Sequence, residues 1–186
     1  MENEWGKGHP VPKPKGRGYM PAAGRSDWGT PAKVFDALAA RFGPFDLDPC
    51  GSADAYASQR CGRHFTVEDD GLRRPWPGRV FVNPPYGRPL NEWVRKCWLE
   101  SQGVAEIVVA LLPARTDTRW FHRYVMGSVY ADRPVAMRAA EVHFVPGRLS
   151  FAGADGPATF PSVVVVWRST GAPIEDAGAE QRSLFE

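Results

Sequence analysis

The sequence predicts an α/β sandwich with a mostly parallel sheet and a late antiparallel hairpin. Two patterns carry this prediction. Through the centre of the chain, short apolar runs typical of strands alternate with stretches of helical periodicity. Such alternation favours parallel strands joined by crossovers. Near the end, two more strand-like runs at 141–145 and 163–167 follow one another without a helix between them, which favours a hairpin.

The first element expected is a helix after Thr30-Pro31, because threonine can cap a helix and proline suits its first position. Gly43-Pro44 ends this helix, and a short strand at 45–48 follows. Residues 53–64 are small and polar and show no clear pattern, whereas 65–67 are expected to form a short strand. The apolar face of the helix consists of residues at helical spacing: Val34, Phe35, Leu38 and Phe42.

The centre of the chain carries the clearest pattern. Residues 79–82 form an apolar run that reads as a buried strand. A helix with one apolar face is expected over 90–102, ended by Gly103. The continuous apolar run 106–112 is typical of a strand covered on both faces, and a short helix is expected at 120–125.

The two ends of the chain differ in composition from the part between them. Residues 1–24 are rich in glycine, proline and basic residues, and they are expected to form a flexible basic arm. This arm is either an inert tail or a segment that contacts DNA phosphates. Residues 171–186 carry mostly acidic charge and are expected to form a disordered acidic tail, which leaves 25–170 as a single domain.

The overall composition excludes several classes. The net charge of the 186 residues is +2, so the total charge alone does not indicate nucleic acid as a partner. Cys50, Cys61 and Cys97 contain no CxxC pair, which argues against a disulfide framework and a zinc site. No apolar run has the ~20 residues that span a bilayer, and no signal peptide is recognisable. A cytoplasmic protein without a metal is therefore the expectation.

The stretch Asn83-Pro84-Pro85-Tyr86 lies directly after the buried strand 79–82. Proline cannot donate to a strand ladder, so two prolines end the strand in a rigid turn. In open α/β sheets, ligands bind at the carboxyl ends of strands. Asn83 would present a carbonyl and an amide there, with the aromatic ring of Tyr86 beside it. The alternative is a proline-rich turn in which Asn83 only satisfies local backbone groups.

This tetrapeptide resembles the Asn-Pro-Pro-Tyr motif of methyltransferases that use S-adenosyl-L-methionine (AdoMet) to methylate amino groups. Taken together with other segments in the same order, it resembles the compact phage-type DNA N6-adenine methyltransferase (Dam) family over roughly residues 26–168. The resemblance implies a Rossmann-like fold, AdoMet as cofactor, and site-specific methyl transfer to the N6 amine of adenine in DNA. Members of this family are also often found in prophages. The other segments are Thr30-Pro31, Asp46-Leu47-Asp48-Pro49, Asp69-Asp70-Gly71-Leu72, Leu112–Thr118 and Gly147–Phe151.

The resemblance implies that Asn83, Pro84, Pro85 and Tyr86 are the catalytic residues. The adenine amine is a poor nucleophile because its lone pair is delocalised into the ring. The side-chain carbonyl of Asn83 and the backbone carbonyl of Pro84 could accept hydrogen bonds from this amine and aim its lone pair at the methyl group. Tyr86 could stack on the base once it has left the duplex. No metal or covalent intermediate is required.

The resemblance places the methionine part of AdoMet at Asp48-Pro49-Cys50-Gly51, where a carboxylate can meet the ammonium group. Only one glycine is present here, whereas the usual pattern has two or three. Asp70 is the candidate for the adenine end of the cofactor, with Asp69 as the alternative and a solvated acidic loop as the non-functional interpretation. The other cofactor-binding candidates are Thr30, Pro31 and Asn83.

A basic, polar loop follows the strand 106–112, and it is a candidate DNA contact. A solvated surface is the alternative for each of its arginines. The chain has no long insert for target recognition, so sequence discrimination would come from small loops. The DNA-binding candidates are Arg115, Thr116, Thr118, Arg119 and Arg148.

Two other functions remain open on the sequence alone. The same tetrapeptide serves enzymes that methylate adenine in RNA or glutamine in proteins, because these amino groups make similar demands. A nucleic-acid-binding or AdoMet-binding homologue without catalysis is the second alternative, and the weak glycine pattern near Gly51 favours it.

Overall fold

The computed structural model describes residues 29–127 and 138–169. The expected arm 1–24 and tail 171–186 lie outside these residues, as do the outermost positions of the expected domain. In the described part, no helix has the length and apolarity needed to cross a membrane. The elements in order are α1 (Ala32–Phe42), β1 (Leu47–Asp48), η1 (Ser58–Arg60), β2 (Arg63–His64), η2 (Gly71–Arg73), β3 (Gly78–Val82), α2 (Leu90–Gln102), β4 (Ala105–Pro113), the π-helix η3 (Phe121–Met126), β5 (Glu141–Phe144) and β6 (Ser162–Arg168).

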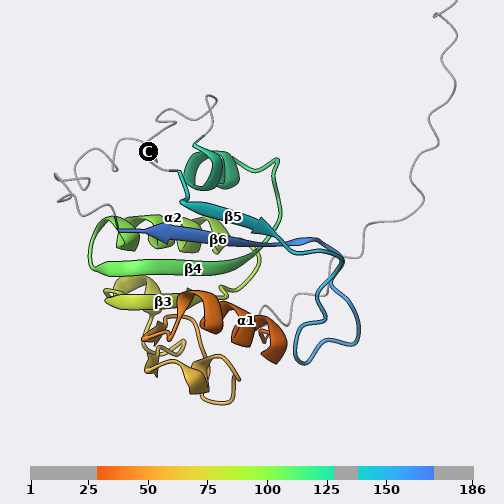
Figure 1. The fold of residues 1–186 in the computed structure, drawn as a ribbon, viewed down its shortest axis with the longest axis horizontal. Helices are drawn as coiled ribbons and strands as arrows, with labels where there is room; N and C mark the ends of the chain where they lie inside the picture. The colour runs from red at the N-terminus through yellow and green to blue at the C-terminus, as the bar shows by residue number, and fades with distance from the viewer. Residues whose placement is uncertain (1–28, 128–137, 170–186) are drawn as a thin grey trace, which may run out of the picture.

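The strands form one sheet in the order β2-β1-β3-β4-β6-β5, and β3, β4, β6 and β5 are seen side by side in Figure 1. The first four strands in this order pair in parallel. Strand β6 then pairs antiparallel with both β4 and β5. The predicted α/β fold, with a mostly parallel sheet and a late antiparallel hairpin, is confirmed.

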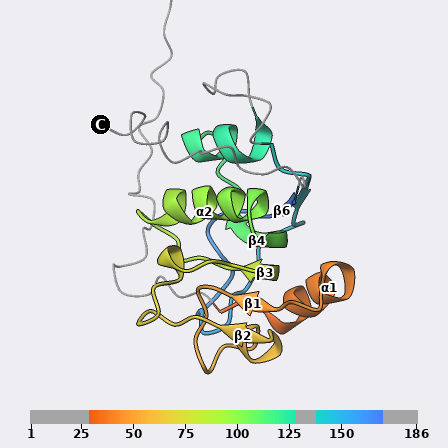
Figure 2. The same ribbon diagram turned by 90° about the vertical axis from the view of Figure 1, so that its left-hand side faces the viewer.

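Helices cover both faces of this sheet, with α1 on one face and α2 on the other (Figure 2). Because side chains alternate along a strand, each central strand contributes to two cores. Phe81 of β3 and Val109 of β4 pack in the cluster of α1, whereas Val80 and Val108 pack in the cluster of α2. This explains why 106–112 is apolar at nearly every position.

Two local predictions near the start of the domain are wrong. Residues 65–67 do not form a strand, because Asp69 accepts a hydrogen bond from the Thr66 amide at 2.9 Å and turns the chain there. The strand at this place is β2, two residues earlier. Thr30 does not cap α1, whose N-cap is Pro31 without a side-chain cap bond. The Thr30 hydroxyl instead accepts a hydrogen bond from Asn83.

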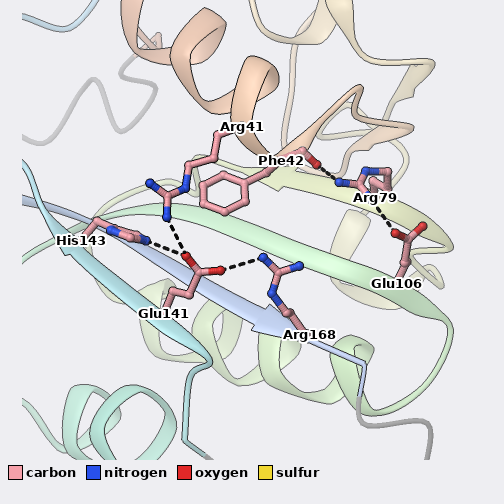
Figure 3. Close-up of polar contacts among 7 residues, drawn as sticks. All are labelled: Arg41, Phe42, Arg79, Glu106, Glu141, His143 and Arg168. Carbon is pink, nitrogen blue, oxygen red and sulfur yellow. Dashed lines mark hydrogen bonds and ion pairs between the residues drawn. The ribbon is translucent and has the colours of Figure 1, made fainter.

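At the edge opposite the carboxyl ends of the parallel strands, Glu141 joins three elements (Figure 3). Its carboxylate contacts Arg41 of α1 at 3.2 Å, Arg168 of β6 at 2.6 Å and His143 of β5 at 3.0 Å. These contacts, foremost the hydrogen bond from Arg168, hold the pKa of Glu141 below its usual value. This charge cluster fastens the end of α1 to the antiparallel hairpin.

Replacing Glu141 by glutamine is therefore expected to lower stability by about 1 kcal/mol, or ~2–4 °C in melting temperature. A carboxyl group with a lowered folded-state pKa stabilises above its unfolded-state pKa, and this contribution is lost as the pH falls through the folded-state pKa. The gap between wild type and Glu141→Gln should thus shrink in acid. Thermal unfolding at several pH values measures it. Glu106→Gln, which removes a more exposed partner of Arg79, is the matched control and should cost less. A gap that does not change with pH would contradict the assignment.

Candidate active site

The candidate site lies where the carboxyl ends of β1 and β3 meet. From β1 the chain runs outward to β2 and then returns to β3 on the other side of β1. The strand order therefore reverses between β1 and β3, and ligands in open α/β sheets bind at such a switch point. A pocket opens there. The predicted site residues that line it are Thr30, Asp48, Cys50, Gly51, Asn83 and Pro85.

Asp48 is a buried carboxylate on the wall of this pocket, with only 4% of its surface exposed. Burial raises the pKa of Asp48, and the hydrogen bonds from Ser58 and Cys50 partly offset that effect. The Ser58 hydroxyl donates to the carboxylate at 2.7 Å, and the Cys50 amide donates at 3.2 Å. A cationic ligand group in the pocket would favour the ionised form of Asp48.

Gly51 allows the wall of the pocket to approach Asp48 closely. A Cβ atom at Gly51 would lie 2.2 Å from the Ser58 hydroxyl oxygen and 2.7 Å from a carboxylate oxygen of Asp48. Those distances are far shorter than van der Waals contact, so any side chain would displace one of these groups. The single glycine of this turn is therefore required by its polar neighbours.

The side-chain amide of Asn83 is held from two sides. Its nitrogen donates to the Thr30 hydroxyl at 3.0 Å, and its oxygen accepts from the Tyr86 hydroxyl at 3.0 Å. The Tyr86 hydroxyl also lies 3.2 Å from the backbone carbonyl of Leu111. Since that hydroxyl has one proton, the Asn83 oxygen and the Leu111 carbonyl compete for it. Thr30 and Tyr86 thus fix a side chain that the sequence placed at a rigid turn.

The ring of Tyr86 packs beneath this turn. It meets Phe160 at 5.5 Å and Phe151 at 5.9 Å between ring centroids, both close to perpendicular. Burial raises the pKa of Tyr86. The structure thus shows packing of this ring within the protein, and stacking of an extruded base on it stays a prediction.

Cys50 connects the Asp48 and Asn83 sides of the pocket. Its thiol lies 3.8 Å from a carboxylate oxygen of Asp48 and accepts a hydrogen bond from the Asn83 backbone. Burial raises the pKa of Cys50 well above its ordinary value. A thiol with so high a pKa is a poor nucleophile, which agrees with a packing role.

A model of the DNA N-6-adenine-methyltransferase (Dam) family matches residues 18–182. The chain belongs to the Dam family. This confirms the family that the motifs indicated.

Two relatives in Escherichia coli and one of its phages resemble parts of this Dam-family chain. The DNA N-6-adenine-methyltransferase of Escherichia phage T1 is 35% identical over 103 residues, which is 54% of this chain and 41% of that protein. The putative methyltransferase YfdM of Escherichia coli (strain K12) is 35% identical over 66 residues, 32% of this chain and 69% of that protein. The match to the phage protein thus spans less than half of that protein's length.

In this Dam-family chain, neither Asp69 nor Asp70 lines the pocket. Asp70 pairs with Arg73 at 3.1 Å, and the side chain of Asp69 holds the Thr66 turn, which lowers the pKa of Asp69. The exposed side chain that does reach the pocket from this segment is Val67, of which 88% is accessible.

Gly71, the next residue of the same motif, packs directly behind the turn at 49–51. A Cβ at Gly71 would lie 1.9 Å from the Pro49 carbonyl oxygen, so the two backbones touch. The Trp76 indole nitrogen donates to the Gly71 carbonyl at 2.8 Å and fixes this contact. Asp70 precedes it with φ 50°, in the left-handed region. The motif Asp69–Leu72 therefore has a visible structural role in positioning residues 49–51.

The DNA-binding candidates of this Dam-family chain lie on loops at the same edge of the sheet as the pocket. The loop with Arg115, Thr116, Thr118 and Arg119 follows the carboxyl end of β4, and Arg148 follows the end of β5. Register places both strand ends together, because Pro113 pairs with Ser162 and Phe144 with Val163. Arg115, Thr116, Arg119 and Arg148 are exposed, Thr118 is half-buried, and none of the five lines the pocket.

Two other cofactor candidates lie beside the pocket rather than on its wall. Pro31 is the N-cap of α1, and Pro49 contacts Gly71. The remaining residues of the pocket wall were not predicted from the sequence: Gly29, Ser52, Ala55, Ala57, Ser58, Val67 and Phe81. Ser58 lies in the stretch 53–64, where small polar residues show no periodicity. Val67 lies in the segment 65–67 that was expected to form a strand, so no sequence signal marked either residue as part of a site. In the part of the chain that the structure describes, no cluster of three or more His, Cys, Asp or Glu side chains could hold a metal ion.

Proposed function

We propose that this chain transfers a methyl group from AdoMet to the N6 amine of adenine in DNA. The observation that carries the proposal is the Asn83 amide, held by Thr30 and Tyr86 at the carboxyl end of β3, beside the buried carboxylate of Asp48. On the Asn83 side, the pocket thus offers a hydrogen-bond acceptor for an amine. On the Asp48 side, it offers a carboxylate that can bind a cationic group. Membership of the Dam family supports this reading of the geometry.

The charged and apolar side chains that line the pocket fit AdoMet. Asp48 would bind the ammonium group of its methionine part, because a buried carboxylate needs a cationic partner. The exposed aliphatic side chain of Val67 at the pocket wall would cover the apolar ring of its adenine part. When bound, AdoMet would supply a methyl group activated by its sulfonium; the methyl–sulfur bond would break, the demethylated cofactor would leave as a neutral thioether, and the proton lost from the amine would pass to solvent.

The protein's part in the transfer is to position the amine and stabilise its charge. The Asn83 side-chain oxygen and the Pro84 carbonyl would accept the two N–H bonds of the target amine, which aims the nitrogen lone pair away from the ring. As positive charge develops on this nitrogen, both acceptors stabilise it. The Tyr86 hydroxyl can then donate to the Leu111 carbonyl, which leaves the Asn83 oxygen to the substrate.

We further infer that the reaction is site-specific and that the loops carrying Arg115 and Arg148 recognise the DNA. They flank the pocket edge and are exposed, so phosphates near an extruded base would lie within their reach. Short loops of this kind can contribute base contacts as well as phosphate contacts.

The direct test is to incubate the full chain with DNA and labelled AdoMet, digest the DNA to nucleosides and measure N6-methyladenine. Parallel reactions with RNA and with a protein pool distinguish the other substrates of the same chemistry. Label in N6-methyladenine from DNA supports the proposal. Label only in RNA or in glutamine would replace the substrate, and AdoMet binding without any transfer would indicate a homologue that binds but does not catalyse.

Tyr86 separates packing from base recognition. Tyr86→Ala is expected to lose about 2–4 kcal/mol of stability, because the ring packs against Phe151 and Phe160. It should also lose activity, since base–aromatic stacking is worth ~1–3 kcal/mol. Tyr86→Phe keeps the ring and should retain most of the stability, whereas loss of the hydroxyl that contacts Asn83 should lower turnover by less than Tyr86→Ala does. Melting temperature and turnover on DNA, measured on the same preparations, check this. A Tyr86→Ala protein that melts as the wild type does would contradict the packing that the structure shows.

A further inference from the structure

Ser58 is the most buried polar side chain on the wall of the pocket, with 1% of its surface exposed. It begins the 3₁₀ helix η1, in the stretch of sequence without periodicity. Its hydroxyl donates to the Asp48 carboxylate at 2.7 Å. The same oxygen accepts a hydrogen bond from the Ser52 amide at 3.2 Å. One hydroxyl therefore contacts both the anion of the pocket and the turn that closes over it.

We propose that Ser58 is a positioning residue for cofactor binding, which fixes the Asp48 carboxylate toward the pocket and fastens the Gly51-Ser52 turn beside it. This inference rests on the proposed function, because it assigns Asp48 to a cationic ligand group. Ser58 does not itself contact the reacting atoms in this assignment. Its two hydrogen bonds determine the orientation of a group that does.

The contacts around Asp48 leave its carboxylate little freedom to take another orientation. One carboxylate oxygen of Asp48 is bound by Ser58, and the other by the amide and thiol of Cys50. Gly51 has no room for a Cβ because the Ser58 hydroxyl and Asp48 lie against it. Rotation of the carboxylate would break bonds on both sides, so the lone pairs directed at the pocket are fixed before a ligand arrives.

The same contact has an electrostatic consequence. Burial disfavours the charged form of Asp48, and the hydrogen bond from Ser58 is the strongest effect in the opposite direction. The other groups that interact with this carboxylate are His64 of β2, which favours its ionisation, and the thiols of Cys50 and Cys61. Removal of Ser58 therefore makes Asp48 harder to ionise, so that it is protonated at a higher pH.

The test compares Ser58→Ala with the wild type in the full chain. AdoMet affinity, measured by calorimetry, is expected to fall about ten-fold or more at neutral pH, since a hydrogen bond to a charged group is lost. The loss should be larger at lower pH and smaller at higher pH, because more of Asp48 is protonated in the variant. A merely structural role would lower affinity equally at every pH.

Ser101→Ala is the matched control. Ser101 is equally buried and its hydroxyl donates at 2.7 Å to the Trp98 carbonyl, but it lies on α2 and does not line the pocket. This variant should lose stability without changing the pH dependence of AdoMet binding. If Ser58→Ala does not fold, Ser58→Cys keeps a weak donor of similar shape and should shift the same quantities less.

A second measurement needs no cofactor. The Asp48 carboxyl titration, followed by NMR on aspartate-labelled chain with Asp48→Asn to assign the signal, should move to higher pH in Ser58→Ala. An unchanged titration together with unchanged AdoMet affinity would overturn the role of Ser58, while methylation of DNA by the wild type would still stand. Failure of the wild type to bind AdoMet at any pH would overturn the proposed function, and with it this inference.

Discussion

Asn83→Ala is expected to abolish methyl transfer to DNA while AdoMet affinity stays within a few-fold of the wild type. Asn83 is assigned to the target amine, so its removal takes away an acceptor that orients the nitrogen and stabilises its developing charge. Loss of one such group costs on the order of 10²–10³-fold in turnover. Single-turnover methylation measured with saturating AdoMet isolates this step from cofactor binding.

The control for this variant is Asn91→Ala, which removes the same side chain from an exposed position on α2 and should leave turnover unchanged. A fold check is also needed, because Asn83 ties the Thr30 segment to the turn. Asn83→Ala should lower the melting temperature only modestly, because it removes the side-chain hydrogen bonds with Thr30 and Tyr86. Turnover near that of the wild type would reject the mechanism.

Asp48→Asn is expected to weaken AdoMet binding about 100-fold or more. Asparagine has nearly the same shape but no charge, so the ammonium group of the cofactor loses its buried counter-ion, and breaking such a pair costs about 3–5 kcal/mol. Calorimetry at constant pH measures the loss. Asp36→Asn, an exposed carboxylate on α1, is the control and should bind AdoMet normally.

The affinity for AdoMet is also expected to depend on pH, and the raised pKa of Asp48 determines the direction of this change. Because burial raises the pKa of Asp48, the carboxyl is protonated at a higher pH than an exposed aspartate. Wild-type affinity for AdoMet should therefore fall as the pH is lowered through this raised pKa, whereas the weak binding of Asp48→Asn should not follow that titration. Between the unfolded-state pKa and this raised folded-state pKa, the folded state holds more protons than the unfolded state, so stability falls as the pH rises through this range and the ionised Asp48 lowers stability at neutral pH.

The cofactor-free Asp48→Asn protein should accordingly melt no lower than the wild type at neutral pH. An improvement in stability with a loss of binding is the behaviour expected of a functional group, because its burial is unfavourable until the ligand arrives. Unchanged AdoMet affinity would instead make the turn at 48–51 structural and would move the cofactor site elsewhere.

The parts of the fold that the sequence predicted are those with a long periodic signal. Helix α2 was expected over 90–102 and spans Leu90–Gln102, because its apolar side chains recur on one face and glycine follows. Strand β4 was expected over 106–112 and extends one residue further at each end. Each of these two elements buries many apolar side chains, and the local conformational preference of one residue cannot outweigh their combined burial.

The stretch between β1 and η2 behaved differently, because tertiary contacts determine it. Strands β1 and β2 have two residues each, which is too short for a period to appear. Whether Thr30 caps a helix or binds Asn83 cannot be decided locally, since both use the same hydroxyl. Asp70-Gly71 looked like a ligand loop, but contact with Pro49 explains its glycine. The candidate site was predicted where its residues follow long strands and was missed at Ser58, where they do not.

The adjacency of β1 and β3 has a consequence for which parts of this chain can change independently. The Asp48 and Asn83 turns follow two hydrogen-bonded parallel strands, which lie about 4.8 Å apart, so the pairing of β1 with β3 limits how far the two turns can separate. The loops with Arg115 and Arg148 follow β4 and β5, which are not part of this strand pair. Insertions or substitutions in those loops could change which DNA is recognised without altering the distance between donor and acceptor. If the proposed function holds, recognition could diversify by substitutions in the loops while the pocket residues stay the same.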